Sequence, residues 1–205
     1  MNEKFFDLSE EKRNAIINAG FSVFSQSEYR HATTDEIVKR AGISKGLLFH
    51  YFGNKKNFYV YLYDYAIAFL VEHTSELYDY KETDFFDSFA SAQMSKMKVL
   101  KEHPDVVQFL VKAYLDGAHE AGTEIDTNFQ AVLEQTSASF LSRVDASKFK
   151  DGISVSQALD VVIWMSEGYM RSRTPEQLKD LEAVNSEFMR YLDILKQQFY
   201  KEEYL

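Results

Sequence analysis

Residues 33–59, TTDEIVKRAGISKGLLFHYFGNKKNFY, constrain the fold most strongly because they hold the start and stop signals of two short helices. Thr33 followed by Glu36 predicts a capping box at the start of the first helix. Gly42 suits the positive φ with which such a helix ends, and Ser44 is a preferred N-cap for the next one. Two short helices joined by so tight a turn predict a helix-turn-helix.

The second helix of this pair has more apolar side chains than it needs for packing against a protein core. Leu48 and Phe52 lie four residues apart, so we expect both to face inward. The outward and flanking positions are then Lys45, Gly46, Leu47, Phe49, His50 and Tyr51. An outward Leu and Phe on so short a helix favour a face that meets a partner. In a helix-turn-helix the second helix enters the major groove of DNA.

This segment resembles the DNA-binding domain of the TetR family of bacterial transcriptional repressors. The resemblance rests on the pair Thr33–Thr34, the turn Ala41–Gly42, the run Ser44–Gly46, the aromatic cluster of residues 49–52 and the pair Asn54–Lys55. It covers residues 9–70, including a first helix expected to begin near Ser9. One departure is Glu28, which stands in a loop where the family usually has glycine and must either avoid or tolerate a positive φ.

The resemblance implies which side chains contact DNA. Lys45 would read a base edge, preferably guanine, and Gly46 would let the helix backbone approach the bases. Leu47 and Phe49 would contact a thymine methyl group or a sugar edge. Phosphate contacts are expected from Thr34, Ser44, His50, Tyr51 and Lys55. For each of these residues, the alternative is an ordinary solvated or capping role.

Charge and composition narrow the class of protein. The 205-residue chain has a net charge of −9. Residues 1–60 contain nine Lys and Arg against seven Asp and Glu, whereas residues 61–205 contain fourteen against twenty-five. Nucleic-acid contact is therefore expected in the N-terminal part alone. The chain has no cysteine, no apolar leader and no apolar stretch long enough to span a membrane, so we expect a cytoplasmic protein without membrane contact.

No signal points to catalysis. The histidines show no metal-ligand spacing; they are His31, His50, His73, His103 and His119. The motif G-x-S-x-G is also absent, so no nucleophile is indicated. We expect no enzyme activity, no metal and no cofactor.

The rest of the chain reads as further helices, which predicts an all-α fold. An apolar helix from Lys55 to about Leu77 is expected to link an N-terminal three-helix DNA-binding domain, residues 1–55, to a helical domain of residues 56–205. Helices are predicted after Asp84, from Pro104, after the loop between Gly117 and Gly122, after a Ser154–Gln157 capping box, and from Thr174 to about Lys201. No segment alternates as a strand does.

The last predicted helix carries an apolar stripe with spacings of three and four residues: Leu181, Val184, Phe188, Tyr191 and Leu195. Such a stripe serves either an intramolecular core or a helix of a second subunit. The resemblance favours a homodimer, with the helix at 154–172 completing a four-helix bundle. Two recognition helices then reach successive major grooves of a near-palindromic double-stranded operator.

The resemblance also implies an effector pocket in the second domain. Its predicted lining is Phe89, Met97, Phe109, Tyr114, Phe129 and Trp164. Such a lining favours a small apolar or aromatic effector, although most aromatic side chains of a helical bundle belong to its core. The implied function is a ligand-responsive repressor. The alternative is a helical interaction protein that has lost DNA reading.

Overall fold

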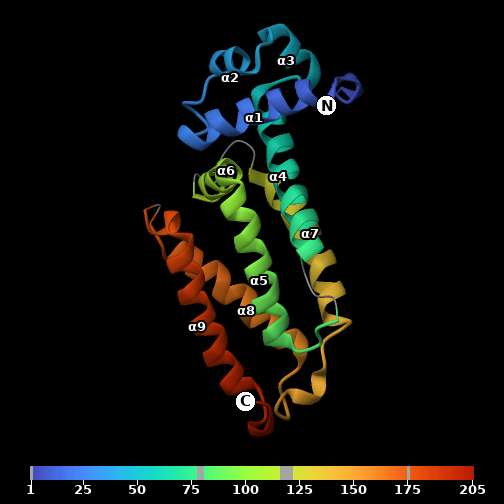
Figure 1. Cartoon of the computed structure of the whole chain (residues 1–205), viewed down its shortest axis with the longest axis vertical. Coiled ribbons are helices and arrows are strands. Elements are labelled where there is room, and N and C mark those ends of the chain that lie inside the picture. Colours follow the sequence, from blue (N-terminus) through green and yellow to red (C-terminus); the bar gives the residue numbers. More distant parts are fainter. Residues whose placement is uncertain (1, 78–80, 116–121, 175) are drawn as a thin grey trace. The chain divides into compact units, whose positions relative to one another are not determined.

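The computed structural model describes residues 2–77, 81–115, 122–174 and 176–205, and of residues 114, 115, 122–129 and 179 only the backbone (Figure 1). Within these ranges the chain is helical, and its one pairing of extended residues is an isolated bridge between Phe149 and Tyr200. The predicted all-α fold is confirmed. The α-helices are α1 (Glu10–Gln26), α2 (Thr34–Ala41), α3 (Lys45–Phe52), α4 (Lys55–Leu77), α5 (Phe85–Glu102), α6 (Pro104–Leu115), α7 (Gly122–Leu141), α8 (Val155–Arg171) and α9 (Leu181–Phe199).

Several helix starts lie where the sequence predicts them. The Asp84 carboxylate accepts the backbone N–H groups of Phe86 and Asp87 at 2.9 and 3.0 Å, which caps α5. Ser154 and Gln157 form both hydrogen bonds of a capping box at α8. These signals act over three residues of chain, so the sequence alone can indicate them.

The last helix begins later than the predicted start at Thr174, so that prediction is wrong. Thr174 and Gln177 exchange two hydrogen bonds in the manner of a capping box, but only the 3-10 turn η3 (Gln177–Lys179) follows them. Helix α9 begins only at Leu181, where Asp180 accepts the N–H of Ala183 at 3.0 Å. A second cap six residues on therefore starts the helix proper.

The chain divides into two compact units. Unit 1 comprises Met1–Val71 and Leu100–Ala131, and unit 2 comprises Glu72–Val99 and Val132–Leu205. Each unit combines two separate stretches of sequence that pack together. Helix α6 therefore belongs to the same unit as the N-terminal helices. The functional boundary expected after residue 55 stays a prediction.

Unit 1 is built around α1. Its inward face carries Ile16, Ala19, Val23 and Phe24, all at most 5% exposed. Helices α2 and α6 both pack against α1, and Figure 1 shows α2 and α3 lying over it. Phe109 of α6 is fully buried in this core. The described part of unit 1 therefore supports the helix-turn-helix from below with a continuous apolar core.

The core of unit 2 lies between α5, α8 and α9. It contains buried side chains from all three helices, from the segment joining α7 to α8 and from the C-cap of α9: Phe85, Phe86, Phe149, Ala158, Leu159, Val162, Leu192 and Tyr200. Helices α8 and α9 contact each other and run side by side in Figure 1. No helix among the described residues is long and apolar enough to cross a membrane, and the cytoplasmic location stays a prediction.

Candidate DNA-binding surface

The turn between α2 and α3 has the predicted geometry. Gly42 takes φ 67°, in the left-handed region, and its N–H bonds to the carbonyl of Val38. Ser44 accepts the N–H of Leu47 at 3.2 Å, which caps α3. The described residues include no residue other than glycine at positive φ, so Glu28 avoids that conformation.

The start of α2 departs from the predicted capping box in one respect. Thr33 accepts the N–H of Glu36 at 3.3 Å as expected. The Glu36 carboxylate instead pairs with Arg40 at 2.7 Å, one turn further along the helix. Arg40 also bonds to Ser22 and Gln26 of α1. Glu36 therefore helps to fasten α2 onto α1 instead of completing the cap.

Helix α3 has the predicted inner and outer faces. Leu48 and Phe52 are each 1% exposed, whereas Lys45, Gly46 and His50 are exposed. The inner face anchors the helix and leaves these three residues to solvent.

Three aromatic or apolar residues of α3 are less accessible than their predicted positions implied. Leu47 is half-buried and packs against the core of unit 1. Phe49 is also half-buried. Tyr51 is 6% exposed, because its ring lies against Phe5 with 5.6 Å between centroids. Their DNA contacts stay predictions.

Lys45 is held by an ion pair in this structure. Its Nζ lies 3.0 Å from Oδ1 and 3.2 Å from Oδ2 of Asp35, in the first turn of α2. Both side chains are largely exposed, so solvent screens the attraction. The predicted base-reading ammonium therefore has a carboxylate partner when no DNA is bound.

The predicted phosphate contacts surround α3. Ser44 and His50 are exposed, and Thr34 is half-buried. The Nζ of Lys55 lies 4.4 Å from the centroid of the Tyr29 ring, a cation–π distance. These residues come from the starts of α2, α3 and α4 and from the end of α3.

Sequence reasoning missed the segment before α1. Its backbone forms the 3-10 turn η1 (Glu3–Phe5), which contacts α3. Phe5 is fully buried and Asn2 reaches His50. The pair Phe5–Phe6 ahead of the first helix was the available signal, since two adjacent aromatic rings favour a segment that packs on a core.

The predicted effector residues are divided between the two units. Phe109 is buried in unit 1, with its ring 5.2 Å from those of Phe21 and Tyr59. In unit 2, Phe89 packs at 5.1 Å from Phe85, Met97 is half-buried and Trp164 is 67% exposed. The side chains of Tyr114 and Phe129 lie outside the described residues.

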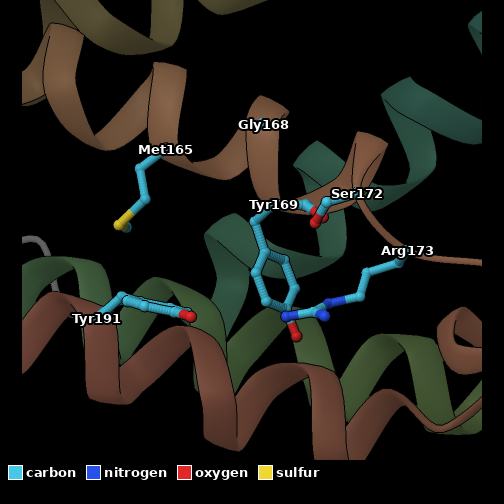
Figure 2. Close-up of a pocket in the computed structure, with 6 residues that line it drawn as sticks. All are labelled: Met165, Gly168, Tyr169, Ser172, Arg173 and Tyr191. Atoms are coloured by element: carbon cyan, nitrogen blue, oxygen red, sulfur yellow. The ribbon is translucent and has the colours of Figure 1, made fainter.

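Unit 2 has a shallow cavity of about 240 Å³ between α8 and α9, lined by Met165, Gly168, Tyr169, Ser172, Arg173 and Tyr191. Figure 2 shows the Arg173 guanidinium beside the Tyr169 ring, at 4.3 Å from its centroid. Arg173 also pairs with Glu187 at 2.9 Å. None of the predicted effector residues lines this cavity, and their role stays a prediction.

The structure divides the predicted stripe of α9 between two faces. Phe188 and Leu195 pack against the core of unit 2, together with Leu192, which the stripe does not include. Tyr191 is 39% exposed and Ile194 54% exposed. Leu181 and Val184 are half-buried. Helix α9 therefore has an apolar face toward its own core and a second apolar side that stays accessible.

Comparison with known proteins places the helix-turn-helix in a family. Residues 16–62 match the family described as bacterial regulatory proteins, tetR family. The chain is 24% identical over 181 residues to the HTH-type transcriptional regulator RutR of Escherichia coli, covering 87% of this chain and 81% of RutR.

Solved structures share the whole fold. A TetR family transcriptional regulator from Chloroflexus aurantiacus aligns with a TM-score of 0.60 and 24% identity, covering 98% of this chain and 99% of that one. The transcriptional regulator FadR from Bacillus subtilis, in complex with stearoyl-CoA, aligns with a TM-score of 0.61 and 17% identity, covering 87% and 96%. The predicted architecture, an N-terminal helix-turn-helix domain followed by a helical domain, is confirmed.

Proposed function

We propose that this chain, which belongs to the TetR family of bacterial transcriptional regulators, is a repressor that binds a near-palindromic operator as a dimer and leaves it when a small apolar or aromatic effector binds. A DNA-binding role in transcription regulation is common to its relatives. The repressor role, the dimer and the effector are our proposal.

The main observation in support of DNA binding by α3 is that this helix has one buried face and one accessible face. Leu48 and Phe52 fix the helix to the core, and Lys45, Gly46 and His50 remain accessible on the other side. A Lys ammonium suits guanine O6 and N7, and a residue without a Cβ lets the backbone approach the bases. His50 and Ser44 suit phosphate oxygens, which fix the register of the helix on the duplex.

The accessible apolar side of α8 and α9 supports the dimer. Trp164, Tyr191 and Ile194 keep 39% to 67% of their surface exposed, although all three are large and apolar. Aromatic side chains of this kind are enriched in protein interfaces. We therefore assign the dimer interface to Trp164, Tyr191 and Ile194, with Leu181 and Val184 at the start of α9.

Release by an effector requires a route from the helical region to the helix-turn-helix. Phe109 supports such a route, because its ring lies 6.4 Å from that of Phe24 in α1 and 5.2 Å from that of Tyr59 in α4. A shift of α6 on effector binding would thus act on α1 and α4, which pack against α2 and α3 of the helix-turn-helix. The effector must bind the non-DNA state more tightly, or the equilibrium does not move.

An apolar effector agrees with the aromatic content of the chain, which is 15% Phe, Trp and Tyr. It also agrees with the likeness to FadR, which was solved with stearoyl-CoA. Screening acyl thioesters and aromatic acids against the operator complex is the direct test of this part of the proposal.

The operator is found by selecting the chain on a pool of random-sequence duplexes at two salt concentrations. We expect enrichment of a near-palindrome with half-sites about one helical turn apart, and weaker binding as salt rises. Lys45→Ala is expected to weaken operator binding about 10- to 100-fold, the cost of one base contact. Lys39→Ala, an exposed lysine on α2, serves as the matched control. Failure of a folded protein to enrich any site would overturn the proposed function.

A further inference from the structure

The segment before α1 packs on the C-terminal half of α3, and we propose that Asn2 is a positioning residue that fixes the protonated nitrogen of the His50 imidazole. With the proton held at Nδ1, His50 offers an N–H donor to a DNA phosphate. The inference rests on the proposed function, since it concerns a predicted phosphate contact. It assigns a role in DNA binding to a residue outside the helix-turn-helix.

The backbone of the segment is fastened to the end of α3. The N–H of Asn2 donates to the carbonyl of Tyr51 at 2.7 Å. The Asn2 amide also lies 3.4 Å from the carbonyl oxygen of His50. The last four carbonyls of a helix have no partner within it. Asn2 therefore satisfies two acceptors at the end of the recognition helix.

Phe5 holds the segment in place from the other side. It is fully buried, with its ring centroid 5.6 Å from Tyr51, 4.9 Å from Phe52 and 5.5 Å from Tyr61. Arg13 of α1 donates to the carbonyls of Phe6 and Leu8 at 2.8 and 2.7 Å. Contacts of the segment with α1, α3 and α4 thus place Asn2.

The orientation of the Asn2 amide follows from its second partner. Its Oδ1 accepts the N–H of Lys4 at 3.1 Å, as the N-cap of η1. The NH₂ group then faces α3 and lies 3.3 Å from Nε2 of His50. An amide NH₂ can only donate, so Nε2 must accept. In the neutral ring the proton is therefore at Nδ1.

This assignment matters for a phosphate contact because phosphate oxygens only accept. The Nδ1–H tautomer gives His50 a donor on the side of the ring away from Asn2. The other tautomer would present a lone pair there and would direct its N–H at an amide that cannot accept it. Asn2 therefore selects the form of His50 that can bind phosphate without being protonated.

Two substitutions of Asn2 distinguish its effect on the His50 tautomer from its role as the N-cap of η1. Asn2→Ser keeps a preferred N-cap but is too short to reach His50. Asn2→Asp keeps the cap and replaces the donor by an acceptor, which favours the proton at Nε2. The readout is the ¹⁵N spectrum of the imidazole, recorded at pH 8 on protein with a C-terminal tag. We expect the Nδ1–H tautomer in the wild type and the Nε2–H tautomer in the Asn2→Asp variant. The same tautomer in both proteins overturns the inference.

The second measurement is affinity for the selected operator. Asn2→Ser is expected to weaken binding about 3- to 10-fold, the range of one hydrogen bond, with an unchanged thermal midpoint. In a His50→Ala background the same substitution is expected to have a much smaller effect, since only the contact of Asn2 with the backbone carbonyl of residue 50 then remains to be lost. An equal loss in both backgrounds overturns the role through His50. A wild-type chain that enriches no operator overturns the proposed function, while the spectrum, which needs no DNA, still decides the tautomer.

Discussion

At the scale of single residues, the ion pair between Asp35 and Lys45 sets the charge that the start of α3 offers to DNA. Oδ1 of Asp35 lies 3.0 Å from Nζ of Lys45. A phosphate or a base must compete with this carboxylate for the ammonium. We therefore expect Asp35 to reduce the electrostatic part of DNA binding, which is the part that does not depend on sequence.

We expect Asp35→Asn to tighten binding to random-sequence DNA about 3- to 10-fold and to steepen the salt dependence by roughly one released counterion. Fluorescence anisotropy across a salt series measures both. Glu36→Gln is the matched control, since it removes the same charge from the same helix but from a carboxylate paired with Arg40. Equal effects of the two variants would show that only net charge matters.

Substitution by alanine is expected to have opposite effects on stability at two glycines of unit 1. A Cβ at Gly46 would meet only Ser44 Oγ, at 4.0 Å, whereas a Cβ at Gly20 would come within 2.5 Å of Leu62 and 2.8 Å of Phe58. Gly46→Ala should therefore keep or raise the thermal midpoint, because alanine favours the helix by up to about 1 kcal/mol. It should weaken operator binding about tenfold or more, since the methyl group separates the backbone from the bases.

Gly20→Ala is expected to destabilise unit 1 by about 1–3 kcal/mol through overpacking. Thermal melts and operator titrations of both variants distinguish the two effects. Unchanged operator affinity in a well-folded Gly46→Ala variant would contradict close approach of α3 to the bases.

At the scale of elements, the start of α5 depends on one buried carboxylate. Asp84 is 4% exposed, caps α5 and receives the Lys148 ammonium at 2.8 Å. Burial opposes ionisation of this carboxyl, but the hydrogen bonds from Lys148 and Asp87 and the charge of Lys196 hold its pKa below the usual 3.8. A carboxyl whose pKa is lower in the folded state stabilises the fold above its unfolded pKa and loses this contribution as pH falls through its folded pKa.

We therefore expect the free energy of unfolding to fall as the pH drops below about 4, in part through Asp84. Asp84→Asn should be less stable than the wild type at pH 7, by about 1–3 kcal/mol, because Lys148 loses its partner and α5 its charged cap. Its stability should also change less between pH 4 and pH 2 than that of the wild type. Urea melts at several pH values measure this, and parallel pH profiles would contradict it.

At the scale of the whole molecule, the two apolar sides of α9 have different expected roles. Ile194 is 54% exposed, whereas Leu192 is 2% exposed in the core of unit 2. If the accessible side is the dimer interface, Ile194→Glu should convert the dimer to a folded monomer with at least tenfold weaker operator binding. Leu192→Ala should instead lower the free energy of unfolding by about 2–5 kcal/mol.

Sedimentation velocity and far-ultraviolet circular dichroism of both variants separate assembly from folding. Trp164→Glu tests the same interface from α8, because Trp164 is 67% exposed. An Ile194→Glu protein that sediments as the wild type does would place the dimer interface elsewhere.

The sequence by itself determined where most of the helices begin and the resemblance of the helix-turn-helix to the TetR family. Caps such as Thr33, Ser44 and Ser154 act over about three residues, and the glycine stop at Gly42 acts on one, so local chain chemistry fixes where these helices begin and end. The four-residue spacing of Leu48 and Phe52 likewise fixes the inner face of α3.

Only the tertiary structure decided which distant segments meet. Asn2 and Phe5 reach a helix almost fifty residues further along the chain, and Phe109 joins the core beneath the helix-turn-helix. The stripe of α9 is split because Leu192, one position after Tyr191, faces the core. Each of these outcomes depends on the rotation and packing of whole helices, where many small contacts compete, and local spacing does not specify that balance.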